Sequence, residues 1–403
     1  MTIGVGGSDS ATELAKLENV CANISTINEL EFKARIKNAQ RLMQQNDIQA
    51  IYLNAGTNLF YFTGMRWHPS ERMVGAILPA KGELVYIAPH FEKGTIIQFM
   101  EVQGDIETWQ EHESPYSLFC NTLKNMGIEQ GSIGIDEATP FFISNGIALA
   151  SNHYQLVSAK EVTAGCRAIK SEKELALMQK AKDITLEVQK AAARILYTGI
   201  STTEVSAFID AAHRKMGAPK GSYFCIVLFG KDSSFPHGVK DPQPLKENDM
   251  VLIDTGCMIG DYISDITRSY VFGQANEKQT AMWQIERNAQ QSAFDAAING
   301  QPCAGIDNAA RTHLASQGMG PEYQTPGCPH RTGHGIGLDI HEWPYLNKAE
   351  QTLLAPGMCF SNEPMLVIPN EYGIRLEDHF YMTEQGAKWF TEPSSSINNP
   401  FNY

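Results

Sequence analysis

The spacing of apolar residues divides the chain into helical and extended segments. Apolar side chains recur at helical spacing over residues 29–46 and 116–126 in the first half. In the second half, Ser171 and Glu174 form the S-x-x-E pattern that begins a long amphipathic helix. Short apolar runs between turn residues predict strands. These strands are expected at residues 50–53, 73–78, 83–88, 132–136 and 154–157, and at 223–230, 250–256, 262–272, 358–368 and 373–383.

The order of these segments predicts two domains. A chain of 403 residues exceeds the usual size of a single hydrophobic core, and a loose polar stretch precedes the first helix. We therefore expect a flexible N-terminal segment at residues 1–25 and a mixed α/β domain at residues 26–162. A larger domain follows at residues 163–403, with further helices expected at 277–299 and 306–316.

Composition and charge mainly exclude classes of partner. Forty-five acidic residues against 32 lysines and arginines give a net charge of −13, which repels nucleic acids and anionic membranes. The apolar runs are far shorter than the ~20 residues that span a bilayer, and the first residues lack the pattern of a secretory signal. Eight scattered cysteines without a CxxC pair predict reduced thiols. We expect a cytoplasmic protein with no nucleic-acid partner and no membrane partner.

Two acidic residues lie in apolar strands that a tight turn would join. Asp254 and Asp265 belong to two neighbouring β runs, and Gly260 lies between them. If Ile259 and Gly260 form the two-residue loop, the two acids face each other across the hairpin, about 5 Å apart. Like charges in this position destabilise a hairpin, so the arrangement predicts a compensating positive charge.

A second pair of acids repeats this pattern downstream. A hairpin centred on Asn370 places Glu363 opposite Glu377, and the strand period of two places Arg375 on the same face as Glu377. At ~4 Å, each pair of like charges costs on the order of 4 kcal/mol at an effective dielectric constant near 20. Two such pairs predict that something positive lies between the four carboxylates.

A glycine-rich stretch supplies histidines for such a site. His330 and His334 have the i, i+4 spacing of a helical zinc site, but Gly333, Gly335 and Gly337 disfavour a helix. We therefore expect an extended stretch in which neighbouring groups lie close to the backbone.

Five motifs together resemble, in order and spacing, those of the pita-bread metallopeptidases. They are Phe235-Pro236-His237-Gly238, the Asp254 and Asp265 pair, Thr332-Gly333-His334-Gly335 followed by His341-Glu342, Asn362-Glu363-Pro364, and Gly373-Ile374-Arg375-Leu376-Glu377-Asp378. The resemblance is strongest to Xaa-Pro dipeptidases (prolidases) and Xaa-Pro aminopeptidases (aminopeptidase P), over about residues 165–395. It implies an α+β fold, in which a smaller mixed α/β creatinase-type N-terminal domain precedes a C-terminal pita-bread (creatinase/aminopeptidase) domain.

The resemblance also implies two divalent metal ions per chain. Their ligands would be Asp254, Asp265, His334, Glu363 and Glu377. Asp265 and Glu377 would bridge both ions, Asp254 would chelate one, and His334 and Glu363 would complete the shells. Four carboxylates carry −4 and two divalent ions carry +4, which resolves the repulsion in the hairpins. An oxygen-rich set with one imidazole suits Mn²⁺, with Fe²⁺, Co²⁺ and Zn²⁺ as alternatives.

The implied reaction is hydrolysis of the Xaa-Pro peptide bond in short proline-containing peptides by a hydroxide that bridges the two metals. By this resemblance, Glu363 would accept the proton of the attacking water. His237 and His341 would contact the carbonyl and the tetrahedral species, and Arg375 would order the site or the substrate. Dipeptides and longer peptides are both open as substrates, and a homodimer is expected because family members are commonly dimers.

Several alternatives remain open at this point. His237 could only close a turn, and Arg375 could be a structural partner of Asp378 or Glu377. Asp378 and His379 are expected to support the ligands or the fold. The chain could also be a creatinase-like hydrolase of another small C–N substrate, or a non-catalytic peptidase-like binding module. Both types have incomplete ligand sets, so the five intact positions favour the peptidase.

Overall fold

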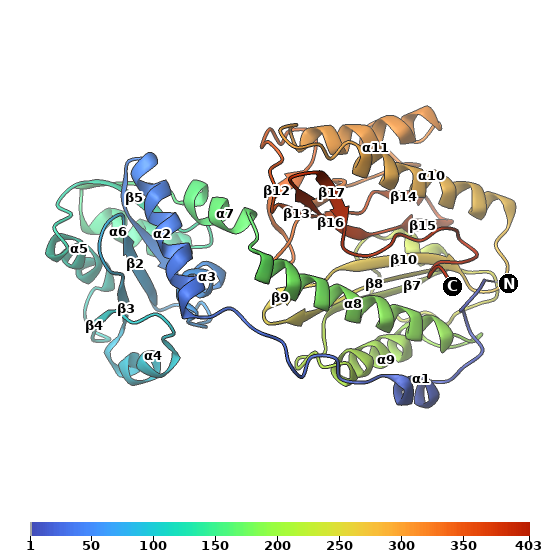
Figure 1. The fold of residues 1–403 in the computed structure, drawn as a ribbon, viewed down its shortest axis with the longest axis horizontal. Coiled ribbons are helices and arrows are strands. Elements are labelled where there is room, and N and C mark those ends of the chain that lie inside the picture. The colour runs from blue at the N-terminus through green and yellow to red at the C-terminus, as the bar shows by residue number, and fades with distance from the viewer. Residues whose placement is uncertain (1) are drawn as a thin grey trace. The chain divides into compact units, whose positions relative to one another are not determined.

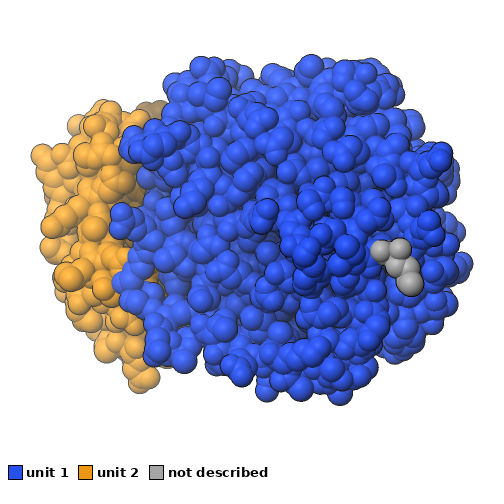
Figure 2. Space-filling model, turned by 45° about the vertical axis from the view of Figure 1, so that its right-hand side comes forward, with its two compact units in different colours: residues 1–26, 168–403 blue, residues 27–167 orange. Residues whose placement is uncertain are grey.

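The computed structural model describes residues 2–403, which form two compact units (Figures 1 and 2). Unit 2 comprises residues 27–167, and unit 1 comprises the described residues through 26 together with residues 168–403. The division falls slightly after the expected domain boundary. The helix α7 (Lys160–Ala168) explains the difference, because the hydroxyl of Tyr61 donates to the Cys166 carbonyl at 3.0 Å and thereby ties most of α7 to unit 2. Among the described residues, no helix is long and apolar enough to cross a membrane.

Unit 2 is built on one six-stranded mixed sheet in the order β4-β3-β2-β1-β5-β6. Its strands are β1 (Ile48–Asn54), β2 (Gly75–Pro79), β3 (Val85–Pro89), β4 (Asp105–Trp109), β5 (Gly131–Ile135) and β6 (Tyr154–Ser158). Its other helices are α2 (Glu29–Gln45), α3 (Thr57–Thr63), α4 (Lys93–Phe99), α5 (Pro115–Asn125) and α6 (Phe141–Ala150). Between sheet and helices, the ring of Tyr52 packs edge-on against that of Phe119, and both are fully buried.

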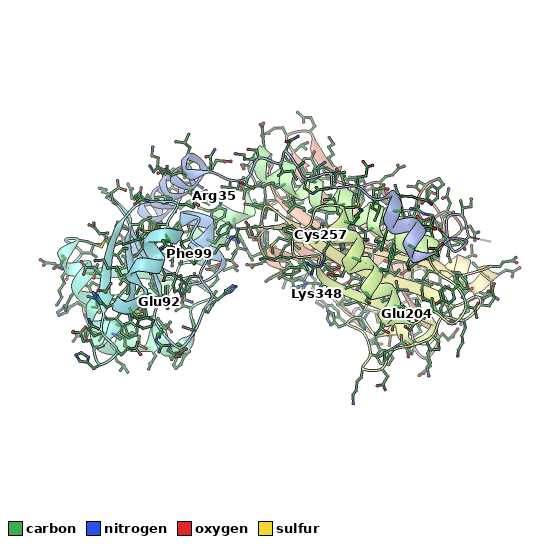
Figure 3. The ribbon with its side chains drawn as sticks, turned by 90° about the horizontal axis from the view of Figure 1, so that it is seen from below. Arg35, Glu92, Phe99, Glu204, Cys257 and Lys348 are labelled. Atoms are coloured by element: carbon green, nitrogen blue, oxygen red, sulfur yellow. The ribbon has the colours of Figure 1, made fainter. Side chains whose placement is uncertain are left out.

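Helix α2 shows how local sequence and packing cooperate in unit 2. Asn28 and Glu31 form a reciprocal capping box at its N-terminus. Arg35, labelled in Figure 3, lies over the Tyr61 ring at 4.1 Å and donates to the Tyr61 carbonyl at 2.9 Å. The buried guanidinium therefore ties α2 to α3.

The N-terminal segment differs from the flexible stretch that we expected. It belongs to unit 1 and contains the helix α1 (Ser10–Lys16). The carboxylate of Glu13 is fully buried and accepts hydrogen bonds from Arg194 Nε at 2.6 Å and from Lys16 Nζ at 2.7 Å. The Thr2 hydroxyl donates to the Val271 carbonyl at 2.8 Å. Polar composition suggested a loose segment, but these polar groups pair with distant partners.

Unit 1 contains a four-stranded sheet in the order β10-β8-β7, with β9 also paired to β8, a five-stranded sheet in the order β12-β11-β13-β16-β17, and a separate β14-β15 ladder. The strands are β7 (Ser222–Phe229), β8 (Met250–Ile259), β9 (Tyr262–Ile263), β10 (Ile266–Val271), β11 (Gly333–Gly335), β12 (Glu342–Leu346), β13 (Cys359–Asn362), β14 (Met365–Ile368), β15 (Tyr372–Arg375), β16 (Asp378–Thr383) and β17 (Gly386–Trp389). The helices are α8 (Glu172–Arg194), α9 (Thr202–Lys215), α10 (Glu277–Asp295) and α11 (Ala304–Ser316). Within unit 1, Figure 1 shows α8 and α9 on one side of the strands and α10 and α11 on the other. The predicted α+β class is thus observed.

The first predicted hairpin forms, but its predicted register is wrong by two residues. Gly260 and Asp261 form the turn, and both have positive φ angles of 53° and 75°. Asp254 therefore faces Thr267 instead of Asp265. The prediction placed a β-branched isoleucine in the turn, where a positive φ is strained. Because the shift is an even number of residues, Asp254 and Asp265 still lie on the same face.

The register predicted for the second hairpin is confirmed. Met365 faces Arg375 in the β14-β15 ladder, and Asn362 faces Asp378 in the β13-β16 ladder. The two ladders have the same pairing offset. The residues between them therefore remain opposite each other, including Glu363 and Glu377. The expected glycine-rich extended stretch is also observed, as β11.

Candidate metal centre

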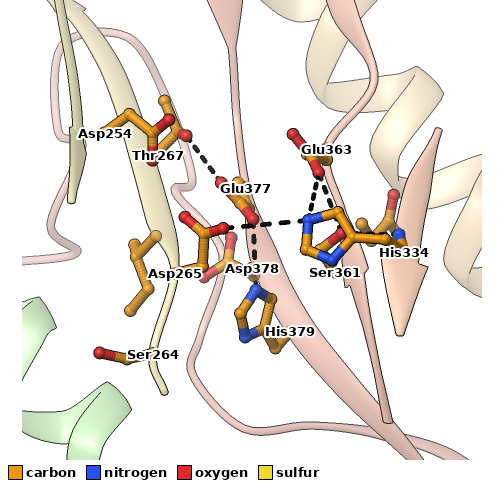
Figure 4. A network of polar contacts seen from close by, with 12 residues as sticks. Asp254, Ser264, Asp265, Thr267, His334, Ser361, Glu363, Glu377, Asp378 and His379 are labelled. Atoms are coloured by element: carbon orange, nitrogen blue, oxygen red, sulfur yellow. Dashed lines mark hydrogen bonds and ion pairs between the residues drawn. The ribbon is translucent and has the colours of Figure 1, made fainter. Parts of the chain in front are cut away.

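Three buried side chains from separate segments bring potential metal ligands together (Figure 4). Asp265 lies between β9 and β10, His334 lies in β11, and Glu377 lies between β15 and β16. One donor atom from each lies within 4.8 Å of the other two. Carboxylate oxygens and an imidazole nitrogen at this separation can share a cation.

The other two predicted ligands flank this group. Glu363 Oε1 lies 3.0 Å from His334 Nε2. Asp254, in β8, contacts Arg375 through Oδ2, and its Oδ1 has no hydrogen-bond partner among the described residues. The same is true of Asp265 Oδ1. Buried carboxylate oxygens without partners are costly, so these two atoms fit a site that a cation completes.

The orientation of His334 points to metal binding through Nε2. Its Nδ1 lies 2.9 Å from the Gly335 carbonyl oxygen, which can only accept, so Nδ1 carries the proton of the neutral ring. In the neutral tautomer that carries this proton, which is the form that binds a metal, the lone pair is on Nε2, and Nε2 faces Glu363 Oε1 at 3.0 Å and Asp265 Oδ2 at 3.9 Å. A lone pair that faces carboxylate oxygens fits a shared cation. The Nδ1 contact is the type that orients metal-binding histidines.

The electrostatics of the cluster also fit a cation. Burial raises the pKa of Asp265 well above its ordinary value, and the nearby carboxylates of Glu377 and Asp254 raise it further. Burial and the charges of Glu363 and Asp254 raise the pKa of Glu377 in the same way. The repulsion predicted from the two hairpins is therefore present in the folded protein, and divalent cations would remove it.

Two hydroxyl groups, neither of them predicted from the sequence, hold the candidate ligands in place. Thr267 donates to Glu377 Oε2 at 2.7 Å. Ser361 accepts the backbone N–H of His334 at 2.9 Å and donates to Glu363 Oε1 at 3.0 Å. Such outer hydrogen bonds orient metal ligands. The strand period of two could have found them, because Thr267 follows Asp265 by two positions and Ser361 precedes Glu363 by two.

Arg375 is bound directly to the cluster. Its guanidinium contacts the Asp254 carboxylate and donates to the Pro236 carbonyl at 3.1 Å. Its ion-pair partners are therefore Asp254 and, at 4.0 Å, Glu363, and neither Asp378 nor Glu377 takes that place. The hydrogen bond to the Pro236 carbonyl also anchors the loop that carries His237, a predicted catalytic residue.

The two helper histidines have different surroundings. The His341 ring lies 4.3 Å from the His334 ring, and partial burial, with a smaller effect of His334, lowers the pKa of His341 to about 4. His341 is therefore a neutral imidazole near pH 7. His237 is exposed and lines a cavity of about 210 Å³ together with Thr202, Ser206 and residues 238–243. The structure thus brings His341 beside the candidate ligand His334 and leaves His237 on an adjoining loop.

Glu342 fixes the stretch between the two histidines of this region. Its Oε1 accepts the backbone N–H groups of Leu338 at 2.9 Å and Asp339 at 3.1 Å, and its Oε2 lies 2.9 Å from Lys170 Nζ. A Cβ at Gly337 would lie 2.8 Å from Glu342 Oε2, so glycine permits this close approach. The expectation of close backbone approach is confirmed at this residue.

Comparisons with known proteins identify the family of this chain. Residues 176–384 match the model of metallopeptidase family M24, and residues 35–169 match the creatinase/prolidase N-terminal domain. The chain is 32% identical over 368 residues to the putative dipeptidase YkvY of Bacillus subtilis, covering 89% of this chain and 97% of that protein. It is 29% identical over 365 residues to the Xaa-Pro dipeptidase of Pyrococcus furiosus, covering 91% and 99% respectively.

The fold is also similar to solved structures. A prolidase from Thermococcus sibiricus superposes with a TM-score of 0.80 at 28% identity, covering 90% of this chain and 97% of that chain. The expected creatinase-type N-terminal domain and pita-bread domain are thereby confirmed. A family match over more than half of the chain, with a buried Asp/His/Glu group that could hold a metal ion, shows that this chain is a metallopeptidase and belongs to family M24.

Proposed function

We propose that this metallopeptidase hydrolyses the Xaa-Pro bond of short peptides with two divalent metal ions. The ligands would be Asp254, Asp265, His334, Glu363 and Glu377. The observation that carries the proposal is the arrangement of their donor atoms, with unpartnered oxygens on both aspartates and His334 Nε2 facing two carboxylates. The naming of relatives as Xaa-Pro dipeptidase and prolidase supports the substrate class.

The donor set favours Mn²⁺, because four carboxylates and one imidazole form an oxygen-rich shell. When bound, the two cations would supply an acidified water as nucleophile and polarise the scissile carbonyl. A homodimer is part of the proposal, and light scattering coupled to size-exclusion chromatography measures it directly.

The protein's own side chains would bind the substrate and move the protons. Glu363, whose Oε1 accepts a hydrogen bond from Ser361 at 3.0 Å, would accept a proton from the attacking water. His341 is neutral near pH 7, so one of its ring nitrogens can donate to the oxygen that becomes negative. Arg375 neutralises Asp254 and holds the loop of His237. A proline nitrogen has no N–H to donate, so recognition must use the ring shape and the charged ends of the peptide.

Metal content and peptide hydrolysis test the proposal together. Chelator-treated protein is reconstituted with Mn²⁺, its metal is counted, and Ala-Pro, Ala-Pro-Ala and Ala-Ala are offered as substrates. We expect about two ions per chain and cleavage of the proline peptides in preference to Ala-Ala. A reconstituted protein that binds no Mn²⁺ and cleaves no proline peptide refutes the proposal.

A further inference from the structure

A fully buried glutamine joins the two strands next to the predicted aspartate ligands. Gln189, on α8, donates through Nε2 to the carbonyl of Ile253 and to the carbonyl of Ile266, both at 2.9 Å. Ile253 immediately precedes Asp254, and Ile266 immediately follows Asp265. One amide group therefore bridges the backbone of β8 and that of β10 beside both aspartates.

A second fully buried glutamine, Gln290 on α10, makes the same type of contact beside the predicted glutamate ligands. Its Nε2 donates to the carbonyl of Leu376 at 3.0 Å and to that of Asn362 at 3.3 Å. Asn362 immediately precedes Glu363, and Leu376 immediately precedes Glu377. Because α8 and α10 lie on opposite sides of the strands of unit 1, the two pairs of carboxylates are held from opposite sides (Figure 1).

The hydrogens of both amides are used on these contacts. An amide NH₂ group has two hydrogens, and for Gln189 they are matched by two carbonyls. Gln290 Nε2 also lies 3.1 Å from Asp378 Oδ2, so an acceptor on the residue after Glu377 shares its hydrogens. The Oε1 atoms of both glutamines are buried without a hydrogen-bond partner among residues 2–403. An unpartnered buried oxygen costs free energy, so the contacts of the nitrogen determine where each amide lies.

We propose that Gln189 and Gln290 are positioning residues of the metal centre, Gln189 for the aspartate pair and Gln290 for the glutamate pair. The inference rests on the proposed function, because it assumes that the four carboxylates bind metal ions. Before an ion binds, the like charges of each pair push the two segments that carry them apart. A glutamine that bridges these segments opposes the repulsion and keeps the donor oxygens close enough to share an ion.

Replacement by methionine tests each contact, because methionine has a similar length and no N–H to donate. Calorimetry measures Mn²⁺ binding to chelator-treated wild type, Gln189→Met and Gln290→Met. We expect each variant to bind Mn²⁺ roughly 10- to 100-fold more weakly than wild type, because an outer contact that orients the ligands has been lost. The visible absorption spectrum of the Co²⁺-loaded variants should also differ from that of wild type, because this spectrum depends on the arrangement of ligands around the ion.

Gln279→Met is the matched control on the same helix as Gln290. The Gln279 side chain is buried, its Nε2 donates to the Asn248 carbonyl at 3.0 Å, and its Oε1 accepts the backbone N–H of Asn276 at 2.9 Å. This variant therefore also loses two hydrogen bonds to the backbone, at positions that adjoin no predicted ligand. It should lose stability in urea as the other two variants do, and it should keep the Mn²⁺ affinity and the Co²⁺ spectrum of wild type.

Shorter amides provide a second test of the same contacts if a methionine variant does not fold. Gln189→Asn and Gln290→Asn keep the NH₂ group but withdraw it by one methylene, so we expect them to weaken Mn²⁺ binding as well. Circular dichroism establishes that each variant is folded.

Two kinds of result overturn the inference. Folded variants that bind Mn²⁺ as tightly as wild type, or as tightly as Gln279→Met, would overturn it and leave the proposed function intact. An effect confined to one glutamine would overturn it for the other. Wild-type protein that binds no Mn²⁺ would overturn the proposed function itself, and the inference with it.

Discussion

Lys182 provides a quantitative test of the electrostatics in unit 1. It lies on α8 with a fully buried ammonium group, which donates to the Ile263 carbonyl at 3.4 Å and lies 4.6 Å from the Phe390 ring centroid. Burial lowers the pKa of Lys182 from 10.5 to about 8, although the charge of Asp265 favours the ammonium form. The folded protein therefore carries an ammonium group in an environment that disfavours it.

The size of this effect follows from the pKa values. A fall from 10.5 to about 8, at about 1.36 kcal/mol per pKa unit, corresponds to roughly 3 kcal/mol of lost stability at pH 7. Lys182→Met removes the charge in a side chain of similar length, but it also removes the hydrogen bond to Ile263, which is worth about 1 kcal/mol. We expect metal-free Lys182→Met to be roughly 2 kcal/mol more stable than metal-free wild type at pH 7.

The pH dependence of this difference has a definite sign. Between pH 8 and pH 10.5, the unfolded chain retains the Lys182 proton while the folded protein releases it. Wild type therefore gains stability as the pH rises through this range, and the advantage of the variant disappears. Above pH 10.5, Lys182→Met should be less stable than wild type by about 1 kcal/mol, because only the effect of the lost hydrogen bond remains.

Urea unfolding of chelator-treated wild type and variant, at several pH values, measures these differences. Lys190→Met is the control on the same helix, because the Lys190 side chain is 22% exposed and pairs with Glu187 at the surface. Its effect should stay within about 0.5 kcal/mol at every pH. Equal stability of wild type and Lys182→Met at pH 7, or a difference independent of pH, would refute the reasoning.

Three further predictions concern the metal centre and the N-terminal segment. Asp265→Asn should lose Mn²⁺ and peptide hydrolysis while its circular dichroism persists, and undiminished turnover would remove Asp265 from the site. Thr267→Val loses the 2.7 Å hydrogen bond to Glu377 and should bind Mn²⁺ about tenfold more weakly by calorimetry; unchanged affinity would contradict an orienting role. Glu13→Gln removes the buried charge that pairs with Arg194 and should lower stability by about 1–3 kcal/mol in urea. Because hydrogen bonds hold the pKa of Glu13 at about 2 despite burial, wild type should lose this stability as the pH falls from 4.5 toward 2, and a pH-independent difference would contradict the pairing.

The sequence by itself determined the elements that depend on neighbouring residues. The capping box at Ser171 predicted the start of α8, because its hydrogen bonds join residues three positions apart. The second hairpin was equally local, since its strands flank a short turn at Asn370, where a positive φ of 65° is tolerated. The candidate ligands were identified by the resemblance of the motifs to those of a known family. The structure brings Asp265, His334 and Glu377 together, with Glu363 beside His334.

Only the tertiary structure decided the features that depend on contacts between distant residues. The register of the first hairpin followed from the backbone angles at Gly260 and Asp261, which residue types alone left open. From the sequence alone, Glu13 would be taken for a solvent-exposed acid, whereas in the structure it pairs with Arg194. Arg331 would likewise be taken for a surface cation, whereas in the structure it stacks on Tyr345. A local pattern specifies hydrogen bonds within a helix or a turn. Pairings across long stretches of chain depend on which surfaces meet when the core packs, and that information belongs to no single segment.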